Sequence, residues 1–578
     1  MSHDATDMNL LMVHADVRAP VLPDGLADQA ARGQSVPDVA PQPSSFWDEG
    51  GDPNDLGAQR WGVIAPQGPE GDRLLALIDP LIRLRGEQQG DRAVKVYRVP
   101  PQMSAPEAMR WKKQVFDGGA DLNIEVPRYQ LILGDLDQVP LAVQQAQQSD
   151  GYVGRLAFDA DDGYAAYVDK VLRHERRAAI AGGPARSLFF TVHDGTAATT
   201  AGHRTLIGPG LDVVRRRHAS GQYPAREILE LGDRALPSPD ELLRAVGDGD
   251  PAVLFTLSHG EGAPRGGWRT YEEQLRRQGA MSFGREGHLV GDELRTRPFL
   301  PGGIWFMLAC YGAGTPSTSA YRHWLAQLAA AGQFRGKPEA VLSGLPAAGD
   351  HPFIAALPKA VLANSDGPLA FMGHVDLAWT YSFQELDAGA AGRPARFMAI
   401  TRSLLKRDRC GIGLRELVRY FDQTNGELTA LYDEEALARS RAETPRVDAA
   451  RQGHLWMLRQ DLSAYVLLGD PAVRLPPAEV AEAAAPRPIE VRGAPEAAPT
   501  ITSPAAPIDM FAGLVPPASA FATPAPTSEV IEAIEAALAH ILLGEQALAE
   551  IAARVRMSRP ELERLVAAYR AAGRRTAP

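Results

Sequence analysis

Two short apolar runs decide the fold of this chain: Ala252-Val253-Leu254-Phe255-Thr256-Leu257 and Gly303-Ile304-Trp305-Phe306-Met307-Leu308-Ala309. Both combine apolar residues with aromatic or β-branched ones between turn-forming residues, a pattern typical of buried strands. Further strands are predicted at residues 61–66, 94–99, 129–135, 187–192 and 225–231, and helices at 74–81, 164–173 and 239–246. Strands that alternate with helices predict an α/β protein with a mostly parallel sheet flanked by helices.

A histidine and a cysteine directly follow the two runs. Ser258-His259-Gly260 comes after the first and Cys310-Tyr311-Gly312 after the second. If the strands are neighbours in a parallel sheet, both side chains leave it at the edge where functional groups gather. An imidazole beside a thiol suits nucleophilic catalysis, because the imidazole can take the thiol proton and the thiolate can attack a carbonyl. Taken alone, such a cysteine more often packs in a core, but the two residues together favour catalysis.

The composition excludes several other classes of protein. The 578 residues include 60 Lys+Arg and 71 Asp+Glu, a net charge of −11 that argues against nucleic-acid binding by the whole chain. Two cysteines exclude a disulfide framework and a cysteine-rich zinc module. No metal-site or phosphate-loop motif is present, and no apolar run approaches the ~20 residues that span a bilayer. With no export signal at the start, we expect a cytoplasmic protein.

Changes in composition divide the chain into five predicted parts. Residues 1–58 read as an irregular arm, 59–180 as an N-terminal α/β subdomain and 181–476 as the subdomain that carries His259 and Cys310. Residues 477–527 form a linker rich in proline and alanine, and 528–578 a small all-α module. The other cysteine, Cys410, lies between helical stretches and is predicted to be structural.

The order of these motifs resembles the caspase-like clan of cysteine peptidases and, within it, the gingipain family. Besides the His259 and Cys310 motifs, the similar segments are residues 129–135 with Val139-Pro140, Asp150-Gly151-Tyr152 before 158–161, 367–376 and 467–475. The similar region covers residues 60–476. The resemblance implies a caspase/gingipain-like fold and a cysteine endopeptidase that cleaves proteins or peptides and needs no metal or other cofactor.

The resemblance also assigns roles to single residues. Cys310 is the nucleophile and His259 its partner, and the backbone N–H groups of Gly260 and Cys310 are the donors to the oxyanion. The long insert between His259 and Cys310 is a candidate mobile or cleavable loop. A peptidase joined to a recruitment module implies a regulated bacterial response, such as antiviral defence or programmed cell death. The alternative is a catalytically silent scaffold, or a DNA-binding regulator that acts through its C-terminal module.

Substrate recognition is predicted at Asp376 and Trp379. A carboxylate beside an aromatic wall would suit a basic side chain in the substrate. The alternative is that Trp379 packs in the core and Asp376 caps a helix. His193-Asp194-Gly195 also ends a predicted strand and could orient a catalytic group, but we do not predict that role for it.

The C-terminal module leaves two kinds of partner open. Residues 550–562 resemble a helix-turn-helix, and from Ile551 onward there are seven arginines against two glutamates. That local charge suits DNA, whereas modules of this size in caspase-like proteases often recruit proteins. We expect a protein partner or activator rather than nucleic acid, a purely structural cap being the third possibility.

Overall fold

The computed structural model describes residues 51–118, 126–176, 183–247, 249–264, 267–332, 339, 342–346, 349–379, 382–383 and 394–477, and all of them belong to one compact unit. Residues 1–50 of the predicted arm lie outside the described residues. So do the predicted linker, apart from its first residue, and the predicted helical module at 528–578. Their assignments stay predictions.

One ten-stranded sheet forms the centre of this unit. In spatial order its strands are β2 (Lys95–Val99), β1 (Trp61–Pro66), β3 (Tyr129–Leu133), β4 (Tyr152–Leu156), β15 (Tyr465–Leu468), β14 (Ala370–His374), β11 (Ile304–Leu308), β7 (Ala252–Leu257), β5 (Arg186–Thr191) and β6 (Ile228–Leu231). Every neighbouring pair is parallel except β14 and β15. The predicted α/β class and mostly parallel sheet are therefore confirmed.

Strand β15, near the end of the described chain, joins two halves of the sheet. It pairs parallel with β4 and antiparallel with β14, so β1–β4 run opposite to the strands beyond β14. The sheet is continuous across the predicted subdomain boundary at residue 180. That boundary stays a prediction.

Helices flank the sheet on both faces. They are α1 (Leu56–Gln59), α2 (Pro69–Leu77), α3 (Asp79–Gln88), α4 (Ala105–Trp111), α5 (Leu141–Gln148), α6 (Asp161–Glu175), α7 (Ala197–Gly202), α8 (Gly208–Ala219), α9 (Pro239–Val246), α10 (Tyr271–Arg277), α11 (Gly291–Leu294), α12 (Arg322–Ala330), α14 (Ala356–Ala363), α15 (Ala395–Leu405), α16 (Cys410–Ser440) and α17 (Ala449–Ser463). The one helix predicted at 74–81 is two, because Pro80 suits the first turn of a new helix and not the interior of an existing one.

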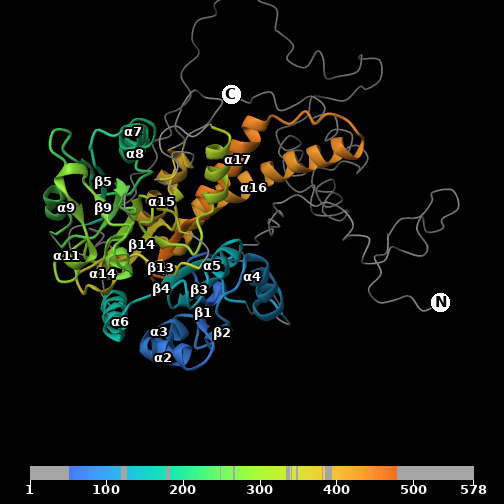
Figure 1. Cartoon of the computed structure of the whole chain (residues 1–578). Helices are drawn as coiled ribbons and strands as arrows, with labels where there is room; N and C mark the ends of the chain where they lie inside the picture. Colours follow the sequence, from blue (N-terminus) through green and yellow to red (C-terminus); the bar gives the residue numbers. More distant parts are fainter. Residues whose placement is uncertain are drawn as a thin grey trace, which may run out of the picture. The chain divides into compact units, whose positions relative to one another are not determined.

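Alternation along the strands explains why both faces are covered. Successive strand residues point to opposite faces. Ile64 of β1 belongs to an apolar cluster with residues of α4 and α5, whereas its neighbour Val63 belongs to the cluster that includes α2 and α3. Figure 1 shows α2 and α3 on one side of β1–β3, and α4 and α5 on the other.

The same alternation packs the other half of the sheet. Phe306 of β11 lies against Phe397 of α15, with ring centroids 5.7 Å apart, while the adjacent Trp305 packs on Phe299 and Phe371. The long helix α16 has ten buried residues, all of them between Cys410 and Leu428, and its second half extends away from the sheet (Figure 1). Within the part of the chain that the structure describes, no helix is long and apolar enough to cross a membrane.

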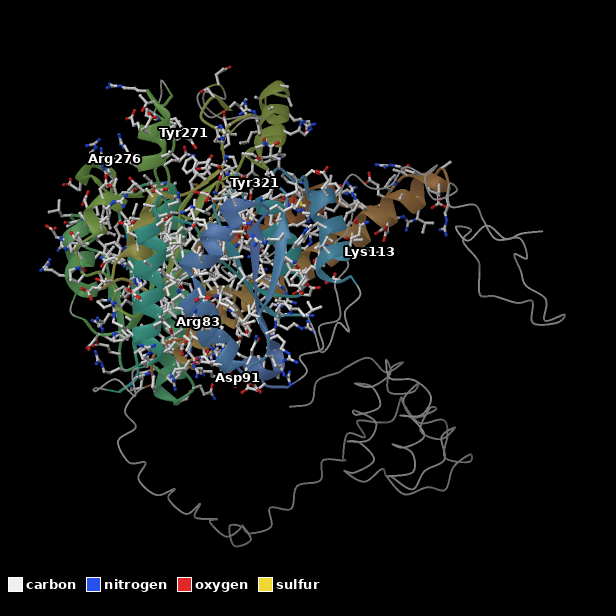
Figure 2. The ribbon with its side chains drawn as sticks, turned by 90° about the horizontal axis from the view of Figure 1, so that it is seen from below. Arg83, Asp91, Lys113, Tyr271, Arg276 and Tyr321 are labelled. Atoms are coloured by element: carbon white, nitrogen blue, oxygen red, sulfur yellow. The ribbon has the colours of Figure 1, made fainter. Side chains whose placement is uncertain are left out.

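The insert between His259 and Cys310 forms a small element beside the sheet. Strands β8 (His259–Gly260), β9 (Met281–Ser282) and β10 (His288–Leu289) make a three-stranded antiparallel sheet, and α10 lies before β9. Figure 2 shows Tyr271 and Arg276 of α10 at the periphery of the molecule. The insert is tied to the loop after Cys310, because the Gln278 amide donates to Thr315 Oγ1 at 2.9 Å. Whether the insert is cleaved stays a prediction.

Candidate active site

The sheet brings the two predicted catalytic residues to one edge. Strands β7 and β11 are parallel neighbours, with Leu257 opposite Leu308. The backbone N–H of Ser258 donates to the Leu308 carbonyl at 3.2 Å, so the two chains still run side by side where the strands end. His259 and Cys310 each lie two residues after the end of their strand. The expected neighbouring arrangement of the two strands is therefore found.

Glycine at position 260 is required by the close approach of the two loops. A Cβ atom on Gly260 would lie 1.8 Å from the carbonyl oxygen of Cys310. No side chain fits at that distance, so the backbone after His259 rests directly on the backbone of Cys310. The sequence predicted that the backbone amides of these two residues bind an oxyanion. That role stays a prediction.

The Cys310 thiol is held by the backbone of Ala378. The Ala378 N–H donates to Sγ at 3.3 Å, and the Ala378 carbonyl oxygen lies 3.6 Å from Sγ, where it can accept the thiol proton. The cysteine is half-buried, and burial raises the pKa of its thiol to about 11. In this arrangement Cys310 is a protonated thiol rather than a thiolate.

His259 is held by the loop after β5, the strand beside β7. Its Nε2 lies 2.8 Å from Thr196 Oγ1 and 3.8 Å from Asp194 Oδ2, while 42% of the side chain is exposed. The Asp194 side chain is 4% exposed and accepts hydrogen bonds from Thr196 and Thr199. Burial alone would raise the pKa of Asp194, but these hydrogen bonds outweigh it and lower the pKa. Asp194 is therefore an ionised carboxylate.

The hydrogen bonds of Thr196 determine which nitrogen of His259 carries a proton. An ionised carboxylate only accepts, so the single hydroxyl proton of Thr196 goes to Asp194 Oδ1, 2.9 Å away. Thr196 Oγ1 must then accept from His259, which places the imidazole proton on Nε2. The neutral ring has its lone pair on Nδ1, the nitrogen that remains free to take a proton.

The two side chains are not bonded to each other in this arrangement. Cys310 is held by Ala378 and His259 by Thr196, and no hydrogen bond among the described residues joins the pair. Their roles as nucleophile and base stay predictions.

The carboxylate of Asp376, a predicted substrate-binding residue, accepts hydrogen bonds from within the protein. The donors are the Ser319 hydroxyl at 2.8 Å and the backbone amides of Ala320 at 2.8 Å and Leu377 at 2.7 Å. Burial raises its pKa despite these bonds. The Ser319 and Ala320 donors lie just before α12.

Trp379, the other predicted substrate-binding residue, belongs to an aromatic cluster. Its ring packs on Tyr321 and Trp324 at centroid distances of 5.8 and 6.0 Å, and Trp456 packs on the same two rings. Its backbone N–H donates to Asp461 Oδ1 at 2.8 Å. Asp376 and Trp379 thus flank the residue that contacts the Cys310 sulfur. Their role in substrate binding stays a prediction.

Among the described residues, no group of three or more His, Cys, Asp or Glu side chains is placed to hold a metal ion. The largest addition to the sequence-based site is the set of Asp194, Thr196 and Thr199. Asp194 does follow a predicted strand, but only the order of the sheet, with β5 beside β7, reveals that it lies next to His259. Threonines in a loop carry no comparable signal in a sequence.

Comparison with known proteins gives matches among solved structures alone. No family model matches the chain, and no curated protein matches it. The structure is similar to that of the Arg-specific cysteine proteinase gingipain R (RGPB), with 12% identity, a TM-score of 0.42 and coverage of 72% of this chain and 78% of that one. It is also similar to the complex of Porphyromonas gingivalis RgpB pro- and mature domains, with 13% identity, a TM-score of 0.40 and coverage of 72% and 79%. At these scores and identities, the function has to be argued from the site itself.

Proposed function

We propose that this protein is a cysteine endopeptidase that cleaves protein substrates with Cys310 as nucleophile and His259 as base. The observation that supports the proposal is the parallel pairing of β7 with β11, two strands whose carboxyl ends lead into His259 and Cys310. The Asp194 carboxylate lies beside the ring of His259. A base whose orientation is set by a third group is the arrangement that activates a nucleophile.

The reaction follows from the protonation states. His259 Nδ1 takes the thiol proton, and the Cys310 thiolate attacks the scissile carbonyl carbon to form a tetrahedral oxyanion. The imidazolium then gives its proton to the leaving amine, and a thioester remains on Cys310. Water attacks the thioester while His259 takes a proton from it. The carboxylic acid then leaves, and the imidazolium returns the proton to the sulfur, which restores the thiol. Throughout, Thr196 and the ionised Asp194 hold the Nε2 proton and stabilise the positive ring.

The remaining parts of the site are part of the same proposal. The backbone amides of Gly260 and Cys310 are the candidate donors to the oxyanion. Asp376 and Trp379 are the candidate substrate-binding residues, because they flank the residue in contact with the sulfur. For Asp376 to bind a basic side chain, its carboxylate must exchange at least one of its present donors for the substrate.

Cleavage of a diverse peptide library tests the proposal. Three proteins are assayed: wild type, Cys310→Ala and Trp324→Ala. The last variant removes a ring that supports Trp379. Cleavage that disappears in Cys310→Ala supports the proposal. Cleavage that persists in that variant, or no cleavage by either of the other two proteins, contradicts it. Cleavage after residues other than Arg and Lys would reject the predicted role of Asp376 alone.

The cellular role is a wider proposal that rests on the predicted order of a peptidase and a recruitment module. It places the enzyme in the cytoplasm, in a regulated response such as antiviral defence or programmed cell death, with a protein activator at the C-terminal module. Two experiments would distinguish a protein partner from nucleic acid. One is a pull-down with residues 528–578 from cells of the source organism, and the other is a DNA-binding titration at two salt concentrations.

A further inference from the structure

We propose that residues 377–379 form an autoinhibitory strap over Cys310, which must move away before the thiol can react. The proposal deepens the proposed function, on which its meaning for catalysis rests. It describes a resting state of the site, in which the nucleophile is covered and its base is engaged elsewhere.

The contact between the strap and the sulfur leaves no room for a substrate on that side. The Ala378 amide nitrogen lies 3.3 Å from Sγ. A carbonyl carbon must come within ~3–3.5 Å of a nucleophile to be attacked. The peptide backbone of Ala378 therefore already occupies the distance that a substrate carbonyl would need.

The strap is fixed at both ends. Before Ala378, the Asp376 carbonyl oxygen accepts from the Tyr311 N–H at 2.9 Å, which ties the strap to the residue after the nucleophile. After Ala378, the Trp379 N–H donates to Asp461, and the Trp379 ring packs on Tyr321 and Trp324. Displacement of Ala378 must therefore break a hydrogen bond, withdraw an aromatic ring from its cluster, or do both.

A buried contact with His374 holds the Asp461 anchor in place. His374 Nε2 lies 3.2 Å from Asp461 Oδ1, and both side chains are fully buried. Burial alone would lower the pKa of His374, but its contacts with Asp461 outweigh this and raise the pKa. Asp461 also accepts a hydrogen bond from Ser382. The anchor is thus part of the rigid interior, and the movable part is the Trp379 ring with its half-buried neighbour Trp324.

The protonation of the thiol agrees with a covered nucleophile. The raised pKa of Cys310 compares with ~8.5 for a free cysteine. At neutral pH the difference leaves on the order of 10² times less thiolate, and only the thiolate reacts with alkylating agents. The Ala378 N–H itself lowers the pKa of the thiol, but burial has the larger effect, so water that reaches the sulfur when the strap opens should return the pKa toward its usual value.

The test is the rate at which iodoacetamide alkylates Cys310, read by mass spectrometry of peptides from the folded full chain. Wild type should react about 10²-fold more slowly than free cysteine at pH 7.5. The variant Trp324→Ala should react at least about tenfold faster than wild type. Trp456→Ala is the matched control: its half-buried ring packs on Tyr321 and Trp324, one ring further from the strap, and we expect a change of less than about threefold.

Three results would overturn the proposal: wild-type Cys310 that reacts as fast as free cysteine, no acceleration in Trp324→Ala, or equal acceleration in both variants. If Trp324→Ala does not fold, the pH profile of wild type decides. A rate that rises through pH 10 supports the strap, and a plateau near pH 8.5 contradicts it. Alkylation needs no peptidase activity. An opened variant that alkylates fast but cleaves no peptide would reject the proposed function and keep the strap.

Discussion

The two cysteines of this chain have raised pKa values for the same reason, burial, but different parts of the molecule bury them. Cys410 begins α16, is 0% exposed, and its N–H donates to the Val473 carbonyl at 2.8 Å. It lies in the main core. Cys310 stands at the end of β11, half-buried, and its sulfur is in contact with the strap.

The charged groups around Cys410 also differ from those of the candidate site. Near Cys410, Asp470 and Arg85 are fully buried and paired at 2.7 Å, and the Trp61 indole N–H also donates to Asp470. At the candidate site, the Asp194 carboxylate lies 3.8 Å from His259 Nε2, and the histidine side chain is 42% exposed. A fully buried ion pair serves stability, whereas a carboxylate that holds an exposed imidazole is placed for chemistry. That a residue is a buried cysteine with a raised pKa therefore does not decide whether its role is structural, as expected for Cys410, or catalytic, as proposed for Cys310.

Replacing each cysteine in turn gives the largest expected contrast. Cys310→Ala should lower peptide cleavage by at least ~10³-fold, since it removes the group that forms the covalent intermediate. Cys410→Ala should keep cleavage within a few-fold of wild type and should lower stability by ~1 kcal/mol, the effect of a small core truncation. Initial rates on one cleaved peptide and urea unfolding curves measure the two quantities. Equal losses of activity in both variants would remove the distinction.

The charge pair beside Cys410 should matter mainly for stability. Asp470→Ala removes the fully buried one of the two carboxylates that pair with the buried Arg85 and should lower the free energy of unfolding by ~3–5 kcal/mol. Glu70→Gln is the control, because it breaks the exposed pair with Arg73 and should change stability by less than about 1 kcal/mol. Denaturant unfolding followed by circular dichroism compares them. Similar changes in the free energy of unfolding for the two variants would show that the buried Asp470 pair stabilises the fold no more than the exposed pair does.

The carboxylate beside His259 should matter mainly for activity. Asp194→Asn should lower kcat by ~10²-fold, because a neutral amide no longer stabilises the imidazolium that forms in the reaction. Thr196→Val should cost ~10-fold and Thr196→Ser should restore most of that loss, since the hydroxyl is the group in contact with Nε2. The pH profile of kcat/KM distinguishes this role from a structural one, because its acid limb should move to lower pH in Asp194→Asn, where the protonated ring loses the carboxylate that stabilises it. An unchanged profile would argue that Asp194 acts only on the fold.

The smallest effect that we expect to resolve is at Gly260. Gly260→Ala forces the two loops apart, because its Cβ would lie 1.8 Å from the Cys310 oxygen, and should cost ~1–3 kcal/mol of stability. Gly262→Ala, two residues further on, has open space around its Cβ position and is the matched control. Thermal unfolding of the two variants gives the comparison. A destabilisation of the same size in both would mean that the close approach of the loops is not the cause.

Local patterns in the sequence predicted most of the strands. The runs at 252–257 and 303–309 become β7 and β11, because strand patterns and their flanking turns are encoded over a few residues. The break between α2 and α3 was missed, because the apolar spacing continues across it although Pro80 starts a new helix. Only β7 and β11 were considered as neighbours from the sequence, and the rest of the strand order was not predicted. The β14–β15 pairing that joins the two halves has no local signal in the sequence.

Only residues with reactive side chains could be predicted as members of the site. His259 and Cys310 stand out because few residue types can do their work. Ala378, by contrast, has no reactive group, and its contact with Cys310 depends on backbone atoms brought together from 68 residues away. Thr196 likewise has no feature in the sequence that indicates a role in the site. Its place beside His259 follows from the pairing of β5 with β7, a long-range property of the sheet.

The central claim is that Cys310, and not Cys410, is a nucleophile activated by His259. The most direct measurement uses peptidyl acyloxymethyl ketones with varied side chains, incubated with the full chain and with Trp324→Ala, and locates the thioether by mass spectrometry. The account predicts an adduct on Cys310 alone, faster in Trp324→Ala and at least ~10²-fold slower in His259→Ala. An adduct on Cys410, or labelling of Cys310 at the same rate without His259, would contradict it.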